Sequence, residues 1–153
     1  MNKLLFFFLL FSLHVANVYS DIIKPNTKIE PYNVVEIQLI SLKNNDKPDK
    51  DFGIEQTWEF AHPENKMNTG PLNNFKKMLK NEIYSILLNH KDHKIEEIYN
   101  NKKIAIYDVI ILGSDNFYYE FKWQVERYNG KGSLNNCWLT TAVSNPVSLG
   151  ASI

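Results

Sequence analysis

The feature that most constrains the fold is a strict alternation of apolar and polar side chains in residues 117–126. One face of this segment would carry Phe117, Tyr119, Phe121, Trp123 and Val125, and the other Tyr118, Glu120, Lys122, Gln124 and Glu126. Since successive side chains of a β-strand point to opposite faces, the pattern predicts a strand that is buried on one side only. Residues 104–112 form a nearly continuous apolar run, which predicts a central strand covered on both faces. Gly113–Asn116 between them predicts a hairpin turn.

The N-terminal half has the spacing of helices. We expect a first helix capped by Asn33 and ending near Leu42, and a second one around Ile54 and Trp58 that ends near Ala61, because proline disfavours the α conformation of the preceding residue, His62. Residues 65–70 are turn-rich. Thr69-Gly70-Pro71 then predicts the start of a third helix reaching about Asn89. Helices followed by strands at 94–143 predict an α+β domain.

The segment Gly53–Leu79, GIEQTWEFAHPENKMNTGPLNNFKKML, resembles the family of domain of unknown function 4864 in its EFAHPENK, TGPL and ML elements. Weaker similarity lies in Val35–Leu42, in Phe121–Gln124 and in Cys137-Trp138-Leu139-Thr140. The resemblance implies an NTF2-like cone, with three N-terminal helices packed on a curved antiparallel sheet, and relatives in bacteria and in plant and algal plastids. His62 stands where the family has a small residue, and the loop 131–136 is longer. The family supplies no catalytic residues.

The first 20 residues have the pattern of a signal peptide. Lys3 provides the positive charge, residues 4–13 form a short apolar core, and Val18 and Ser20 are the small residues before a cleavage site. The predicted organisation is a signal peptide at 1–20, a short flexible lead-in at 21–32, a single domain at 33–146 and a tail at 147–153. We expect entry into the secretory pathway, with a secreted or lumenal product, or alternatively plastid delivery through a two-part leader. No later segment predicts a membrane span.

Composition excludes some functions and leaves others open. The chain has 17 basic and 17 acidic residues, with Arg127 as its single arginine and no sustained basic run, so nucleic-acid binding is disfavoured. Cys137 is the single cysteine, so no disulfide forms within the chain. We expect it to be a small buried residue beside Trp138, although a reactive thiol is the alternative.

Few residues suggest chemistry. Asp108 interrupts the apolar run 104–112, and it could act as a general base if its face of the strand were buried in a pocket; an exposed or ion-paired carboxylate is the alternative. His62 is a second acid–base candidate, or a loop residue bonded to the following turn. Tyr119, Trp123 and Trp138 could line a ligand pocket or simply belong to the core. His90 and His93 lack a third metal ligand and are expected to be solvated at a helix end, so neither a metal nor another cofactor is predicted.

Two function classes follow. The first is a non-catalytic module that binds a small molecule or a protein partner, including a second copy through the sheet face of residues 118–126. The second is a small isomerase, cyclase or dehydratase that uses Asp108 or His62. The first is preferred because no pair of titratable groups is arranged for catalysis, and a fold alone does not define a reaction.

Overall fold

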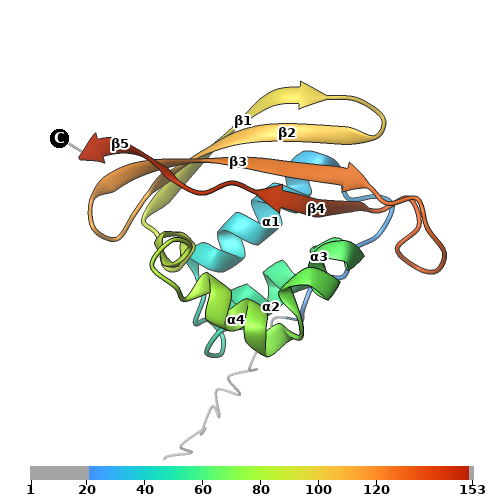
Figure 1. Ribbon diagram of the computed structural model, residues 1–153, viewed down its shortest axis with the longest axis horizontal. Coiled ribbons are helices and arrows are strands. Elements are labelled where there is room, and N and C mark those ends of the chain that lie inside the picture. Colours follow the sequence, from blue (N-terminus) through green and yellow to red (C-terminus); the bar gives the residue numbers. More distant parts are fainter. Residues whose placement is uncertain (1–20, 152–153) are drawn as a thin grey trace, which may run out of the picture.

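The computed structural model describes residues 21–151, which fold into helices followed by one antiparallel sheet (Figure 1). The helices are α1 (Pro31–Lys43), α2 (Phe52–Glu59), α3 (Pro63–Thr69) and α4 (Leu72–Leu79), with a short 3-10 helix, η1 (Ser85–Leu87), after them. The strands are β1 (Asp92–Asn100), β2 (Ile104–Leu112), β3 (Phe117–Arg127), β4 (Trp138–Val143) and β5 (Val147–Ala151). The expected α+β class is confirmed.

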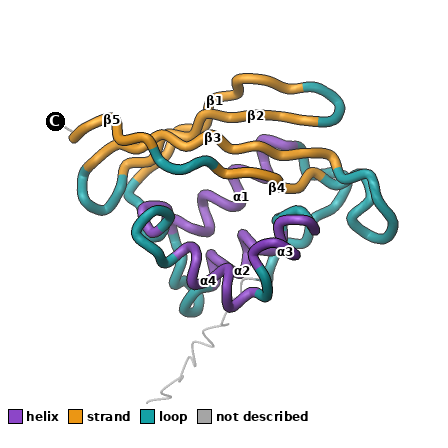
Figure 2. Tube along the Cα trace, viewed as in Figure 1, coloured by secondary structure: helices purple, strands orange, loops and turns teal. Residues whose placement is uncertain are grey.

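The sheet is open, and the helices cover one of its faces. Its strand order is β1-β2-β3-β4, and β5 pairs with the first half of β3 beyond the end of β4 (Figure 2). The alternation in β3 is confirmed for Phe121, Trp123 and Val125, which are buried toward the helices, whereas Phe117 at the start of the strand is exposed. Strand β2 also alternates: Ala105, Tyr107, Val109 and Ile111 are buried, whereas Ile104, Ile106, Asp108, Ile110 and Leu112 are half-buried on the face without helices. The expectation that β2 is covered on both faces is therefore wrong.

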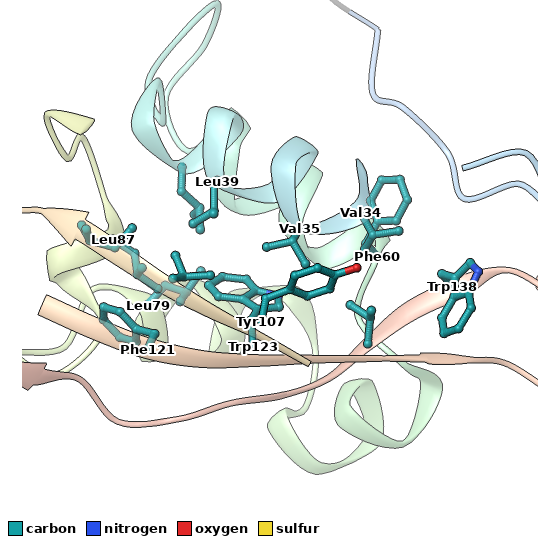
Figure 3. Close-up of a cluster of buried hydrophobic side chains, with 14 of the residues drawn as sticks. Val34, Val35, Leu39, Phe60, Leu79, Leu87, Tyr107, Phe121, Trp123 and Trp138 are labelled. Atoms are coloured by element: carbon teal, nitrogen blue, oxygen red, sulfur yellow. The ribbon is translucent and has the colours of Figure 1, made fainter. Parts of the chain in front are cut away.

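The core lies between this sheet and helices α1, α2 and α4. Figure 3 shows Trp123 and Tyr107 at its centre, under Val35 and Leu39 of α1, with Leu79 and Leu87 at one side. Burial of these side chains is the main favourable contribution to folding. Helix α4 is clearly amphipathic, whereas α1 is apolar on much of its surface.

The helices differ from the prediction in number and in length. Helix α1 begins two residues before Asn33, because Pro31 supplies a preset φ at the first turn. Pro63 likewise starts α3, whose seven residues were expected to be mostly turn, and His62 caps it. Four α-helices therefore occur in residues 21–151, where three were expected.

The predicted long third helix ends at Leu79. The side chain of Asn81 accepts hydrogen bonds from the backbone N–H groups of Ile83 and Tyr84, both at 3.0 Å. Such local bonds compete with the helical backbone pattern. Residues 83–87 therefore do not continue α4. Their apolar side chains pack on the core from a turn and from η1.

Both predicted ends of the domain need correction. The segment expected to be a tail contributes β5, whose Val147 and Leu149 are exposed, so backbone pairing rather than burial holds it. The lead-in is anchored to α2: Gln56 accepts from the N–H of Ile23 at 2.7 Å and donates to its carbonyl at 2.8 Å, as a neighbouring strand would. The predicted signal peptide lies outside the described residues.

Candidate functional site

A cavity of about 250 Å³ lies between the helices and the β3–β4 half of the sheet. We call it the α4–β4 cavity. Its walls are mainly apolar and its polar side chains carry no charge; it is lined by Gln38, Leu42, Thr57, Ala61, Asn65, Thr69, Phe75, Met78, Leu79, Tyr84, Leu87, Trp123, Thr140, Thr141, Ala142 and Val143. Close packing normally leaves few voids larger than a water molecule, so this partly open space is the candidate site of the domain.

Buried polar side chains form the inner end of the cavity. The Gln38 Oε1 atom accepts from Thr140 Oγ1 at 2.6 Å and from Trp123 Nε1 at 3.1 Å. The Gln38 Nε2 atom donates to the Thr57 carbonyl oxygen at 3.1 Å. This network joins α1, α2, β3 and β4 at one point. Each of its bonds is formed away from water, where leaving a polar group unpaired is costly.

Helix α3 borders the outer side of the cavity; Lys66 joins it to the end of α2, and Asn65 joins it to β4. The Nδ2 atom of Asn65 donates to the carbonyl oxygens of Thr140 at 3.1 Å and of Thr141 at 2.7 Å. The backbone N–H of His62 also donates to Thr140, at 2.9 Å. None of the residues of α3 is buried. The helix is therefore attached to the free edge of β4 by hydrogen bonds rather than by an apolar face.

The lining has no acid–base pair for catalysis. Among the described residues that line the cavity, none is Asp, Glu, Lys, Arg or His, and Tyr84 is the one side chain with an ionisable group. The Tyr84 hydroxyl lies at the rim, 3.4 Å from the carbonyl oxygen of Val143. The site is therefore suited to hold an uncharged molecule, and it offers little for proton transfer.

Asp108 is not in this cavity. It lies on the helix-free face of β2, opposite Lys122 of β3, and its carboxylate accepts a hydrogen bond from Lys122 Nζ at 2.7 Å. Its side chain is 22% exposed. The expectation of a buried general base fails because the helices cover the opposite set of β2 side chains, and the alternative of an ion-paired carboxylate is found.

His62 is also outside the cavity lining. Its Nδ1 atom accepts from the backbone N–H of Glu64 at 3.2 Å, and its ring stands edge-on to Tyr128 with the centroids 5.4 Å apart. The first contact is a helix cap, in agreement with the expected alternative of a bond to the following turn, and the second is an aromatic packing contact.

The three aromatic candidates are in three different places. Trp123 lines the cavity and also belongs to the hydrophobic core, so both alternatives describe it. Tyr119 instead donates to Asp115 at 2.6 Å beside an open cleft at the β2–β3 turn. Trp138 is buried at the edge of the core and does not line the cavity (Figure 3).

Sequence reasoning missed Gln38, Thr140 and Asn65. A usable signal existed for Gln38, because it lies four residues after Val34 and four before Leu42, so it shares their apolar helical face. A polar residue in that position has to find partners in the core. The sequence contained no comparable signal for Asn65, whose partners are backbone carbonyls about 75 residues away.

His90 and His93 form a hydrogen-bonded pair and not a solvated helix end. His90 is buried, its Nδ1 lies 2.7 Å from the Leu87 carbonyl oxygen, and its Nε2 lies 2.7 Å from Nδ1 of His93. Burial lowers the pKa of His90 to about 4 and also lowers the pKa of His93. Within residues 21–151, no group of three or more His, Cys, Asp or Glu side chains is placed to hold a metal ion.

Cys137 is fully buried, as expected, and its Sγ lies 3.7 Å from the Ser133 carbonyl oxygen. Burial raises the pKa of this thiol. None of the helices of residues 21–151 has both the length and the apolar character needed to cross a membrane.

Comparison with known proteins found no matching family model, no matching curated protein and no matching solved structure. The resemblance to domain of unknown function 4864 stays a prediction, and function has to be argued from the α4–β4 cavity.

Proposed function

We propose that this protein is a non-catalytic binding module for a small, uncharged and mainly apolar molecule. The observation that carries the proposal is the α4–β4 cavity of about 250 Å³, which has apolar walls, a buried polar inner end and no charged lining residue. An engineered apolar cavity of about 150 Å³ is enough to bind benzene, so this one has room for a somewhat larger ring system. The alternative of a small isomerase, cyclase or dehydratase is less favoured, because Asp108 and His62 lie elsewhere.

The arrangement of helices on one face of an antiparallel sheet supports an NTF2-like cone. In that reading the α4–β4 cavity is the interior of the cone. The leader at residues 1–20 supports entry into the secretory pathway. A fluorescent protein fused after the leader would separate secretion from delivery to a plastid.

Naphthalene is a suitable first probe because it is neutral, apolar and lacks hydrogen-bonding groups. We expect titration with naphthalene to shift the indole N–H resonance of Trp123, while that of Trp138, which does not line the cavity, stays in place. Val143 stands at the rim of the cavity, so Val143→Phe should fill part of it and weaken binding at least tenfold. Val147→Phe is the matched control, since Val147 is exposed on β5.

Two results would overturn the binding proposal. One is that naphthalene leaves the Trp123 resonance unchanged up to its solubility limit. The other is that Val143→Phe and Val147→Phe bind naphthalene equally well.

We also infer that the helix-free face of the sheet pairs with a second copy of the chain. Ile106, Ile110 and Leu112 are half-buried on this face around the Asp108–Lys122 ion pair. A twofold axis near that pair would bring the acid of one copy to the base of the other, as isologous contacts require. Sedimentation velocity should detect a dimer that Ile110→Lys dissociates. The control Ile83→Lys places the same charge at an exposed isoleucine outside the sheet and should leave the dimer intact. A monomeric wild type would contradict the inference.

A further inference from the structure

The amide of Gln38 has one hydrogen-bonding position that the protein does not use. Gln38 is 1% exposed and lines the inner end of the α4–β4 cavity. Its oxygen accepts two hydrogen bonds, which fill its two lone pairs. Its nitrogen carries two hydrogens, and only one of them is donated, to Thr57. The second N–H has no partner among the described residues.

The orientation of this amide follows from its neighbours. The indole nitrogen of Trp123 can only donate a hydrogen bond, and the backbone carbonyl of Thr57 can only accept one. Turning the amide over would place two donors against each other at Trp123 and two acceptors at Thr57. The unused position is therefore a donor, and it belongs to a side chain fixed by three bonds.

A buried N–H group that lacks an acceptor destabilises the folded protein. A ligand that brings an acceptor to this position recovers that free energy on binding, whereas a purely apolar ligand of the same shape does not. A ligand that only donates finds the oxygen of Gln38 already occupied. The lack of charged lining residues disfavours carboxylates and amines, because nothing in the cavity would neutralise them.

We propose that the cavity selects neutral carbonyl compounds, such as ketones, esters or amides, whose oxygen accepts a hydrogen bond from Gln38 Nε2. This assignment rests on the binding function proposed above and specifies its ligand class. Gln38 is then the residue that determines specificity, and Phe75, Leu79, Leu87 and the ring of Trp123 contact the apolar body of the ligand.

The test compares 2-acetylnaphthalene with 2-isopropenylnaphthalene, which has the same shape but carries a CH₂ group in place of the carbonyl oxygen. We expect the ketone to bind about tenfold more tightly, in line with one recovered hydrogen bond. The ketone, and not the hydrocarbon, should also shift one of the two amide proton resonances of Gln38 downfield. In Gln38→Met, which keeps the volume of the side chain, the two affinities should become equal.

The outcomes separate the two proposals. Equal affinity of the wild type for both compounds would overturn the role of Gln38 and leave the binding function standing; this is the result expected if a bound water already satisfies the donor. Binding of neither compound would overturn the binding function itself. Because Gln38→Met removes partners of Trp123 and Thr140 and could fail to fold, the wild-type comparison and the amide resonances decide the question without it.

Discussion

Gly53 lies so close to Ser41 that a Cβ atom on Gly53 would stand 2.1 Å from the Ser41 carbonyl oxygen. Ser41 belongs to the last turn of α1 and Gly53 to the first turn of α2, and the N–H of Gly53 donates to Asn45 at 2.9 Å. The absence of a side chain at Gly53 thus sets how closely the two helices approach. This close approach brings Gln38 within hydrogen-bond distance of the Thr57 carbonyl oxygen at the inner end of the cavity.

Gly53→Ala should therefore destabilise the protein by about 2 kcal/mol or more, because two backbones have to move apart. The effect opposes helix propensity, which favours alanine over glycine by about 1 kcal/mol. Urea denaturation would measure the change. In the control Gly132→Ala, the new methyl group meets open space, and only the positive φ of 91° is strained. A variant Gly53→Ala as stable as wild type would contradict the close contact.

Asn65→Ala should loosen α3 without unfolding the domain. The variant removes both hydrogen bonds from Asn65 to β4, and α3 has no buried residue to replace them. Segments with few buried contacts open locally at low free energy. We expect faster hydrogen exchange of the α3 amides and faster release of a bound probe, with a global stability loss of about 1–2 kcal/mol.

Asn68→Ala is the matched control for that prediction, since Asn68 is an exposed asparagine of the same helix. Its exchange and release rates should equal those of the wild type. If both variants behave alike, the Asn65 bonds do not hold α3 against β4.

The His90–His93 pair should make the protein less stable in acid. Burial lowers both pKa values, that of His90 to about 4; Lys43 lowers them further, while Asp92 raises both and Glu36 raises that of His93. Because the folded-state pKa values lie below the unfolded value of about 6.5, the unfolded chain takes up protons first as the pH falls. The stabilisation is complete above about pH 6.5 and is lost between pH 6.5 and 4, on the order of 2–3 kcal/mol.

Urea unfolding at pH 7.5, 6 and 5 would measure this loss. His90→Gln keeps a donor for the Leu87 carbonyl oxygen but does not titrate, so it should flatten the dependence. The carboxyl groups of Asp46, Asp92 and Asp115 have lowered pKa values and contribute only below about pH 4. Equal stability of the wild type at pH 7.5 and 5 would show that the pair accepts a proton without cost.

Asp108→Asn should leave ligand binding unchanged. The carboxylate lies on the helix-free face with Lys122, across the sheet from the cavity. Exposed ion pairs contribute about 0–1 kcal/mol, so the stability of the single chain, measured at a concentration below that of dimer formation, should change by no more than that. Calorimetric titration with 2-acetylnaphthalene would measure the affinity of the variant. An affinity more than twofold below that of the wild type would show that Asp108 contributes to the binding site.

The strands were easier to predict than the helices for a physical reason. A period of two in residues 117–126 predicts which side chains of β3 face the core, and the structure keeps that pattern from Phe121 onward, whereas Phe117 is exposed. The apolar run of β2 carries no such information, because large apolar side chains on both faces conceal which face the helices cover. The sequence therefore left two positions open for Asp108, and the structure has the ion-paired one.

The helix ends and the cavity depend on contacts that a single sequence does not display. The apolar spacing of residues 72–87 suggested one helix, but the side chain of Asn81 ends it by bonding Ile83 and Tyr84. The polar inner end of the cavity forms because the side chains of Gln38, Trp123 and Thr140 meet, although they lie up to 102 residues apart in the sequence. Trp123 was a candidate because it is large and apolar, whereas its polar partners were not recognised.

Cys137 should be unreactive in the folded protein. It is fully buried, it lies against the Ser133 carbonyl oxygen at 3.7 Å, and burial raises the pKa of its thiol, so the reactive thiolate is scarce. We expect its reaction with a chromogenic disulfide reagent to be at least about a hundredfold slower than in urea, because it has to wait for local opening. The control is a Cys137→Ala chain that carries Ser133→Cys, which places the thiol at an exposed position of the same loop and should react at once. If the native thiol at 137 reacts as fast as the one at 133, then the segment 129–136 opens readily, and Cys137 is the reactive thiol that the sequence left as an alternative.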